Sequence, residues 1–135
     1  MKIAVVKETF PGENRVAVVP GAIGPLLKAG HTVCVERAAG LAAGFSDDAY
    51  AAAGAELVDR DEAFRSDCLL AVRVGGACGA NWATDRQRLS AATTLIGMAD
   101  PLGSATACAE DARTGATVYA LELVPRITRA QCMDV

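Results

Sequence analysis

The 135-residue sequence lacks several residue types and patterns that whole classes of function require. It has a single histidine, His31, so catalysis of the Ser-His-Asp or Cys-His type would have only this residue as its base. Acidic residues outnumber basic ones, 16 against 13, and no basic stripe suggests a nucleic-acid surface. No run of about 18 apolar residues is present, so no membrane-spanning segment is expected. The N-terminal stretch also lacks the long apolar region of a secretory signal, which predicts a cytoplasmic protein.

Metal and disulfide chemistry are not expected either. The five cysteines are an odd number, and no two of them have CxxC spacing: Cys34, Cys68, Cys78, Cys108 and Cys132. Most of them lie in or beside apolar or alanine-rich runs, where a reduced cysteine acts as a small hydrophobe. We therefore predict free thiols, no disulfide framework and no metal site.

The glycine fingerprint of a dinucleotide site is also missing. No GxGxxG motif follows an apolar run, and the glycines of Gly75-Gly76-Ala77-Cys78-Gly79 stand at the wrong offsets. We expect residues 75–80 to be a loop. A tight dinucleotide site within this chain is not expected.

What is present is a regular alternation of strand-like and helical stretches. Hydrophobic residues make up 52% of the chain and charged residues 21%, enough apolar surface for one domain-sized core. Ser46 and Ser104 are placed to begin helices, and Gly30, Gly54 and Gly115 to end them. Strands are expected at residues 3–6, 32–36, 56–58, 68–74, 93–98 and 117–123. The pattern predicts an α/β fold with a mainly parallel sheet and helices on both faces, of the Rossmann or flavodoxin type.

The final stretch, from Pro125 to Val135, carries the strongest polar cluster. It follows an apolar strand and contains Arg126, Arg129, Gln131 and Asp134. Ligands of α/β sheets bind at the carboxyl ends of the strands. Arginine offers a fork of donors to an anion, and glutamine with aspartate can hold an amide group. The alternative is a solvated tail. Because the chain stops inside this cluster, we expect it to be part of a larger protein.

Two further arginines are weaker candidates for substrate binding. Arg15 ends the polar loop Lys7–Arg15 and can face an anion or a carboxamide; the alternative is a solvated turn built on Pro11-Gly12. Arg73 ends an apolar strand, and the alternative is an arginine that faces water. His31 falls at the opposite edge, where we expect a turn residue without a catalytic role. The loops at residues 7–15, 73–79 and 126–135 are predicted to share one edge of the sheet.

The terminal run closely resembles a known family. Residues 120–134 read ALELVPRITRAQCMD and are similar to the α subunit of proton-translocating NAD(P) transhydrogenases. The opening stretch at residues 7–20, with Lys7-Glu8 and Pro11-Gly12-Glu13-Asn14-Arg15, is similar to the same family and is shared with alanine dehydrogenases. Residues 44–48 and 53–55 fall where the family has similar residues. The resemblance covers residues 1–135 and indicates the alanine dehydrogenase/transhydrogenase N-terminal domain.

The resemblance implies a function and a set of partners. This chain would be the incomplete first domain of a two-domain NAD(H)-binding component, with the dinucleotide fingerprint in the second domain. Arg126, Gln131 and Asp134 would be the catalytic and cofactor-binding residues, on a loop that folds over the nicotinamide. Hydride would pass directly between NAD(H) and NADP(H) on a partner component, coupled to proton movement through a separate membrane part. A homo-oligomer is implied, peripheral to the membrane through its partner subunits, with no nucleic acid and no membrane insertion of its own.

Two alternatives remain at this point. The alanine dehydrogenase branch uses an arginine in the opening loop, a lysine at the end of the fourth strand and a histidine after the next strand. Arg15 fits the first, but Arg73 stands where the lysine should be, and Met98 or its neighbour where the histidine should be. Two of the three groups are gone, which favours the transhydrogenase. The other alternative is a non-catalytic association module, which applies if the natural chain ends at Val135.

Overall fold

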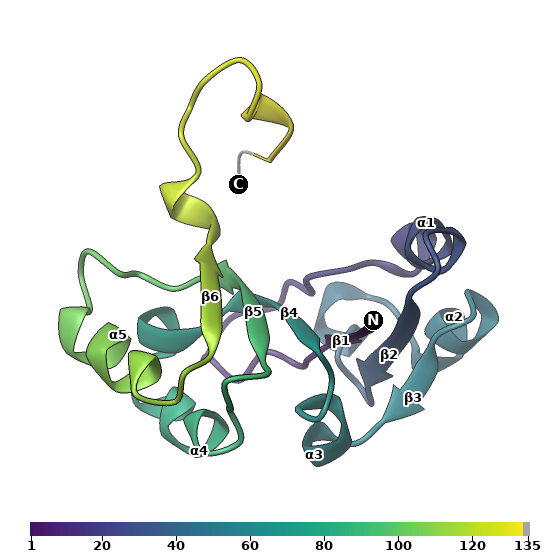
Figure 1. Ribbon diagram of the computed structural model, residues 1–135. Coiled ribbons are helices and arrows are strands. Elements are labelled where there is room, and N and C mark those ends of the chain that lie inside the picture. The colour runs from purple at the N-terminus through teal and green to yellow at the C-terminus, as the bar shows by residue number, and fades with distance from the viewer. Residues whose placement is uncertain (134–135) are drawn as a thin grey trace.

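A six-stranded parallel sheet forms the centre of the computed structural model, which describes residues 1–133 (Figure 1). The strands are β1 (Lys2–Val5), β2 (Thr32–Glu36), β3 (Glu56–Val58), β4 (Cys68–Arg73), β5 (Thr94–Met98) and β6 (Thr117–Ala120). Their order is β3-β2-β1-β4-β5-β6, and every neighbouring pair is parallel. The predicted fold class is confirmed.

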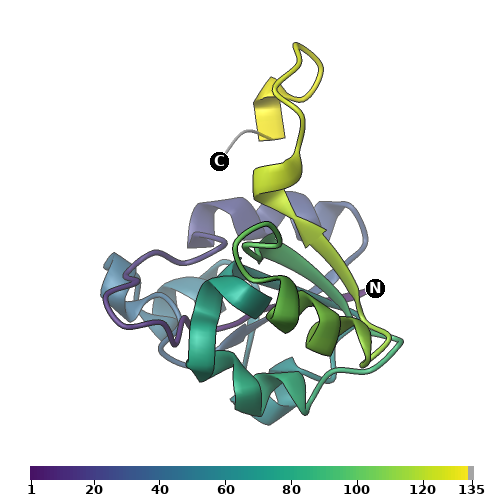
Figure 2. The same ribbon diagram turned by 90° about the vertical axis from the view of Figure 1, so that its left-hand side faces the viewer.

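Helices cover one face of this sheet widely and the other face only in part. Helices α1 (Ile23–Lys28) and α2 (Asp47–Ala52) lie on one side, over the half formed by β1, β2 and β3. Helices α3 (Arg60–Ala63), α4 (Ala83–Arg86) and α5 (Ala105–Ala112) lie on the other side, with the 3-10 segment Gly75–Trp82 (Figures 1 and 2). Both faces therefore carry helices, but only the face with α3, α4 and α5 is covered from β3 to β5, since its cluster includes Val58, Cys34 and Leu95.

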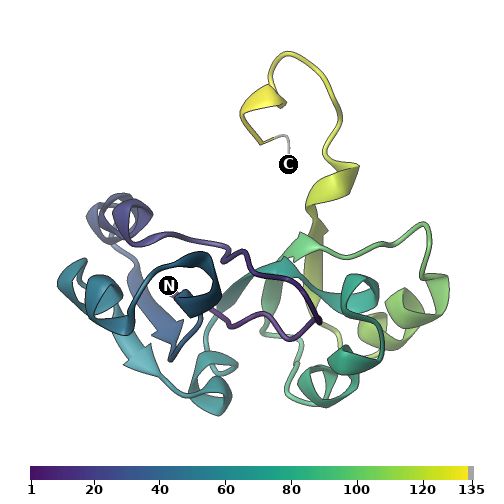
Figure 3. The ribbon, with the colours of Figure 1, turned by 180° about the vertical axis from the view of Figure 1, so that it is seen from behind.

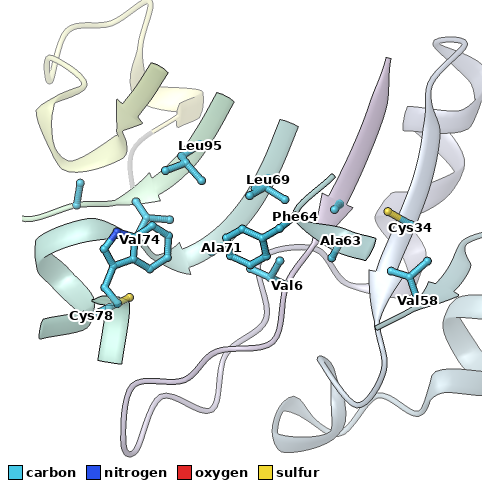
Figure 4. Packing of buried hydrophobic residues seen from close by; sticks show 13 residues of the cluster. Val6, Cys34, Val58, Ala63, Phe64, Leu69, Ala71, Val74, Cys78 and Leu95 are labelled. Atoms are coloured by element: carbon cyan, nitrogen blue, oxygen red, sulfur yellow. The ribbon is translucent and has the colours of Figure 1, made fainter. Parts of the chain in front are cut away.

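The larger apolar cluster lies between the sheet and the side that carries α3, α4 and α5 (Figure 4). Leu69 and Leu95 reach it from the middle strands, and Phe64 and Trp82 close it from below with ring centroids 6.5 Å apart. All four side chains are buried. Each large apolar side chain buried in this way contributes about 1.5–3 kcal/mol to folding.

The opposite face is covered over only half of its width. Its cluster contains Val33, Val35 and the fully buried Tyr50, whose hydroxyl donates to the Val18 carbonyl at 2.9 Å. None of the described members of this cluster comes from β4, β5 or β6. On those strands Leu70, Ile96 and Tyr119 stand in register on the same face, and Tyr119 is 60% exposed. This half of the face is an apolar surface that the helices do not reach.

Several local predictions are confirmed. Ser46 caps α2, because its hydroxyl accepts a hydrogen bond from the Ala49 N–H at 3.3 Å. Gly30 and Gly54 follow α1 and α2 with φ of 83° and 94°, a conformation that glycine adopts without steric cost. His31 lies between α1 and the start of β2, at the amino edge of the sheet as expected.

Three local predictions are wrong. The Ser104 side chain does not cap α5: no helix N–H donates to its hydroxyl, which is directed to the Asp100 carboxylate and donates to it at 2.8 Å. The stretch predicted as a glycine loop forms the 3-10 segment Gly75–Trp82, in which Gly75 and Gly79 take positive φ. The last strand ends at Ala120 and not at Leu123, since Leu121–Leu123 form a 3-10 turn.

Candidate functional site

The loops that leave the carboxyl ends of the strands define the candidate site. The chain leaves β1 at Val5, β4 at Arg73, β5 at Met98 and β6 at Ala120. Because the strands are parallel, these exits share one edge of the sheet. The loop that follows β1 turns back along this edge before it reaches α1 (Figure 3).

Two carboxylates fix the loop after β1. Glu8 accepts hydrogen bonds from the backbone N–H groups of Val72, at 2.7 Å, and Arg73, at 3.2 Å, and so joins this loop to the end of β4. Burial raises the pKa of the Glu8 carboxyl, against the opposing effect of those two hydrogen bonds. Glu36, at the end of β2, accepts from the Lys7 N–H at 2.8 Å.

Arg60 connects Glu36 and the loop after β1 to helix α4. Its guanidinium forms ion pairs with Glu36, at 2.7 Å, and with the buried Asp85 of α4, and it donates to the Lys7 carbonyl at 3.1 Å. Burial by itself lowers the pKa of Arg60, but the pairs with Asp85 and Glu36 outweigh burial and raise it overall. The path of the chain out of β1 is therefore held by a buried network of charges.

Glu13 brings together the two arginines that the sequence analysis proposed for substrate binding. Its carboxylate pairs with the Arg15 guanidinium through two contacts of 2.7 Å and with Arg73 Nε at 2.9 Å. The Glu13 side chain is only 5% exposed, whereas the Arg15 side chain is 61% exposed. Hydrogen bonds from Arg15, and secondarily from Arg73, lower the pKa of Glu13 to about 2 despite desolvation. The charge of Arg15 is thus met by a carboxylate of the same loop.

Arg73 does not face water. Its guanidinium carbon lies 4.4 Å from the centre of the Phe10 ring, and its side chain is 30% exposed. Stacking of this kind holds a guanidinium in a defined plane. Arg15 and Arg73 therefore form one cluster with Glu13 and Phe10, two residues that the sequence analysis did not single out. The acidic residue two positions before Arg15 was the available signal.

Two adjoining hollows open beside this cluster. A charged cleft of about 450 Å³ is lined by Arg15 and Arg73 on one part and by Asp100 and Glu122 on another. A second hollow of about 320 Å³ is mainly apolar and is lined by residues that include Leu70, Ile96 and Leu121. Arg15 and Met98 line both, so the two hollows adjoin at the carboxyl edge.

The segment after β6 stands away from the rest of the molecule (Figures 1 and 2). Its base is the turn Leu121–Leu123, where the Glu122 carboxylate accepts from the backbone N–H groups of Ala99, at 2.8 Å, and Asp100. Arg126 and Gln131 are both exposed on this segment, and Gln131 begins a 3-10 turn, Gln131–Met133. The structure does not bring them against Arg15 and Arg73. Asp134, the third predicted site residue, lies outside the described residues.

Other chemistry has little support in the described part of the chain. Within residues 1–133, no group of three or more histidine, cysteine or carboxylate side chains is arranged to hold a metal ion. All five cysteines fall in this range and are unpaired. Burial raises the pKa of the Cys78 thiol to about 12, so this thiol stays protonated and unreactive near neutral pH. No helix among the same residues has the length and apolar character needed to cross a bilayer.

Comparison with known proteins identifies similar sequences and similar structures. The model of the family described as "Alanine dehydrogenase/PNT, N-terminal domain" matches residues 4–135. The NAD(P) transhydrogenase subunit alpha of Cereibacter sphaeroides is 42% identical over 134 residues, which are 99% of this chain and 25% of that protein.

Solved structures agree. The transhydrogenase from Sinorhizobium meliloti has a TM-score of 0.90 and 34% identity over 99% of this chain and 39% of its own. An L-alanine dehydrogenase has a TM-score of 0.86 and 28% identity over 96% of this chain and 34% of its own. The chain thus spans between a quarter and two-fifths of the length of these relatives. A family model that matches nearly every residue, together with this fold, shows that the chain belongs to the alanine dehydrogenase/PNT N-terminal domain family.

Proposed function

We propose that this chain is the part of an NAD(P) transhydrogenase α component that supplies the segment over the nicotinamide of NAD(H). The complete enzyme transfers hydride directly between NAD(H) and NADP(H) and couples the transfer to proton translocation. The observation that carries the proposal is the exposed polar segment beyond β6, which bears Arg126 and Gln131 in the motif shared with transhydrogenases. An exposed, polar stretch on a well-packed sheet has the character of a ligand-contacting loop.

The described residues suit the orientation of a nicotinamide better than the binding of a whole dinucleotide. The guanidinium of Arg126 and the amide of Gln131 offer donors and an acceptor of the kind that a carboxamide needs. Gly75–Gly79 lacks the offsets that cradle a pyrophosphate, so the dinucleotide itself would be held by another domain. NAD(H) supplies the hydride when bound. The contribution of this chain is geometric, because Arg126, Gln131 and Asp134 set the position of the ring.

The geometry gives less support to alanine dehydrogenase chemistry. Reduction of an imino acid needs a group that handles a proton at the substrate. Met98 or its neighbour stands where that branch has its histidine, and neither Met98, Gly97 nor Ala99 can transfer a proton. Arg15 is already paired with Glu13, and Arg73, at the position of the lysine, is stacked on Phe10. No contact of the described residues specifically favours a purely non-catalytic module.

The same proposal defines partners and location. The partners are the NADP(H)-binding and membrane components of the enzyme, together with further copies of this chain. The component would lie on the cytoplasmic side, peripheral to the membrane through those subunits.

A chimera tests the proposal. Residues 1–135 would replace the matching stretch of the Cereibacter sphaeroides subunit alpha, with its partner subunits present. We expect the chimera to reduce an NADP⁺ analogue with NADH, whereas the same subunit without this stretch should not. A folded chimera that binds NADH but transfers no hydride, or that reduces pyruvate in the presence of ammonium instead, would contradict the proposal.

A further inference from the structure

A carboxylate anchors the base of the projecting segment. Glu122 lies in the turn Leu121–Leu123, and its Oε1 accepts hydrogen bonds from both the Ala99 N–H and the Asp100 N–H. These two groups belong to the turn that follows β5. Charge-assisted hydrogen bonds of this type are roughly twice as strong as neutral ones. Glu122 therefore ties the start of the segment to the end of the neighbouring strand.

The turn that receives Glu122 is itself well defined. Ala99 is buried, and Asp100 has a φ of 50°, in the left-handed region that few residues other than glycine adopt. The Asp100 carboxylate accepts from the Ser104 hydroxyl at 2.8 Å, and the Asp100 carbonyl accepts from the Ser104 N–H at 2.9 Å. The attachment point is thus fixed by its own bonds and by the start of α5.

Beyond Glu122, the described backbone includes hydrogen bonds within the segment itself. The Val124 N–H donates to Leu121 at 3.1 Å, and the Ala130 N–H donates to Ile127 at 2.8 Å. These two bonds shape the segment internally, whereas the bonds of Glu122 link its base to the sheet. Arg126 stands four positions beyond Glu122, which is at most about 13 Å of extended chain. A tilt of about 5° at the base then displaces the guanidinium by about 1 Å, an error that can cost about a hundredfold in rate.

We infer that Glu122 is a positioning residue, which aims Arg126 and Gln131 at the nicotinamide by bonding the base of their segment to the Ala99–Asp100 turn. The inference rests on the proposed function. Glu122 lies at the base of the segment, and Arg126 and Gln131 lie beyond it. Loss of Glu122 should therefore misplace those two side chains, which lowers the rate of hydride transfer more than the affinity for NADH.

The test uses the chimera in single-turnover hydride transfer. Glu122→Ala removes both bonds and should slow transfer about tenfold or more, while the Kd for NADH changes less than threefold. Glu122→Gln keeps an acceptor oxygen at the same reach and should stay within about threefold of the parent. Glu122→Asp keeps the charge but is one methylene too short, and it should be slowed as Glu122→Ala is. It serves as the second test where Glu122→Ala does not fold.

A matched control separates positioning from stability. Asp59→Ala also removes a carboxylate that accepts a backbone N–H, that of Glu62 at 2.8 Å, but at β3 on the far edge of the sheet. It should lower the melting temperature similarly and leave the rate unchanged. Parent-like rates for both Glu122→Ala and Glu122→Asp, or an equal loss in Asp59→Ala, overturn the inference. Arg126→Ala distinguishes a failure of this inference from a failure of the proposed function. If Arg126→Ala transfers hydride at the parent rate, the proposed function is contradicted. If Arg126→Ala is slowed but Glu122→Ala is not, only the role of Glu122 is contradicted.

Discussion

Replacement of Glu13 by glutamine should destabilise the fold by an amount that depends on pH. The glutamine keeps the shape of the side chain and removes the charge that pairs with Arg15 and Arg73. Those arginines lower the pKa of Glu13 from 4.5 to about 2. A shift of this size sets a ceiling of about 3.4 kcal/mol on the stabilisation. Because the Arg15 side chain is 61% exposed to water, we expect about 1–2 kcal/mol at neutral pH.

The direction of the pH dependence follows from the lowered pKa. A carboxyl with a depressed pKa in the folded state stabilises the protein fully above its ordinary value, here 4.5, and loses that effect as the pH falls towards about 2. Other titrating groups are common to both proteins and cancel in the difference. The gap in unfolding free energy between wild type and Glu13→Gln should therefore shrink to about half or less between pH 6 and pH 3.

Urea denaturation of the chain, followed by circular dichroism at several pH values, measures this gap. Asp61→Asn is a suitable control, since Asp61 is an exposed carboxylate paired with Arg88, and its replacement should change stability little. Arg15→Gln should be far less damaging in the Glu13→Gln background than in wild type. A gap that stays constant from pH 6 to pH 3 would refute the reasoning, because the loss would then come from packing and not from charge.

Three further outcomes are expected. In the complete component, Arg126→Ala, Gln131→Asn and Asp134→Asn should each slow hydride transfer from NADH about ten- to a hundredfold, or roughly 1.4–2.7 kcal/mol. The melting temperature should stay nearly constant, and His31→Asn is the control that should leave the rate unchanged. Unchanged single-turnover rates, or variants that unfold, would show that the segment is structural. Residues 1–135 alone should bind NADH weakly or not at all, and micromolar affinity by calorimetric titration would contradict this. The open face at Leu70, Ile96 and Tyr119 should make the chain self-associate, so Tyr119→Lys should shift light scattering towards the monomer; a wild-type chain that is already a stable monomer argues against that role of the face.

The positions of the strands along the chain could be predicted from the sequence because the signals that mark them are local. Apolar runs such as Cys68–Arg73 place most strand ends to within a residue or two, β6 excepted. Gly30 and Gly54 mark helix ends by their backbone freedom. The same local rules assign Ser46 and Ser104 the same role. They fail at Ser104 because its hydroxyl is directed towards the Asp100 carboxylate, four residues earlier, and accepts no N–H of the helix.

The details of the site were not accessible for a different reason. Glu13 and Glu122 matter through partners from other strands, Arg73 and the Ala99–Asp100 turn, which the linear sequence does not connect to them. The end of β6 at Ala120 was missed for the same reason. The apolar residues beside Glu122 favour a longer strand, but Glu122 bonds to the turn after β5 and lies in a 3-10 turn. The roles of Arg126, Gln131 and Asp134 remain predictions from the shared motif.

The arrangement of the strands as two consecutive halves of one sheet also bears on how the chain folds. β1, β2 and β3 with α1 and α2 use only residues 2–58, and β4, β5 and β6 with α4 and α5 use only residues 68–120. Each half closes short loops, whereas the pairing of Ile3 with Cys68 between β1 and β4 joins residues 65 positions apart. Closure of a long loop costs more conformational entropy than closure of a short one, and non-local pairings are the slow ones to form. We therefore expect the seam between β1 and β4 to form after the pairings within each half. It is then held by the apolar cluster that runs from Cys34 to Leu95 and by the bonds of Glu8 and Arg60.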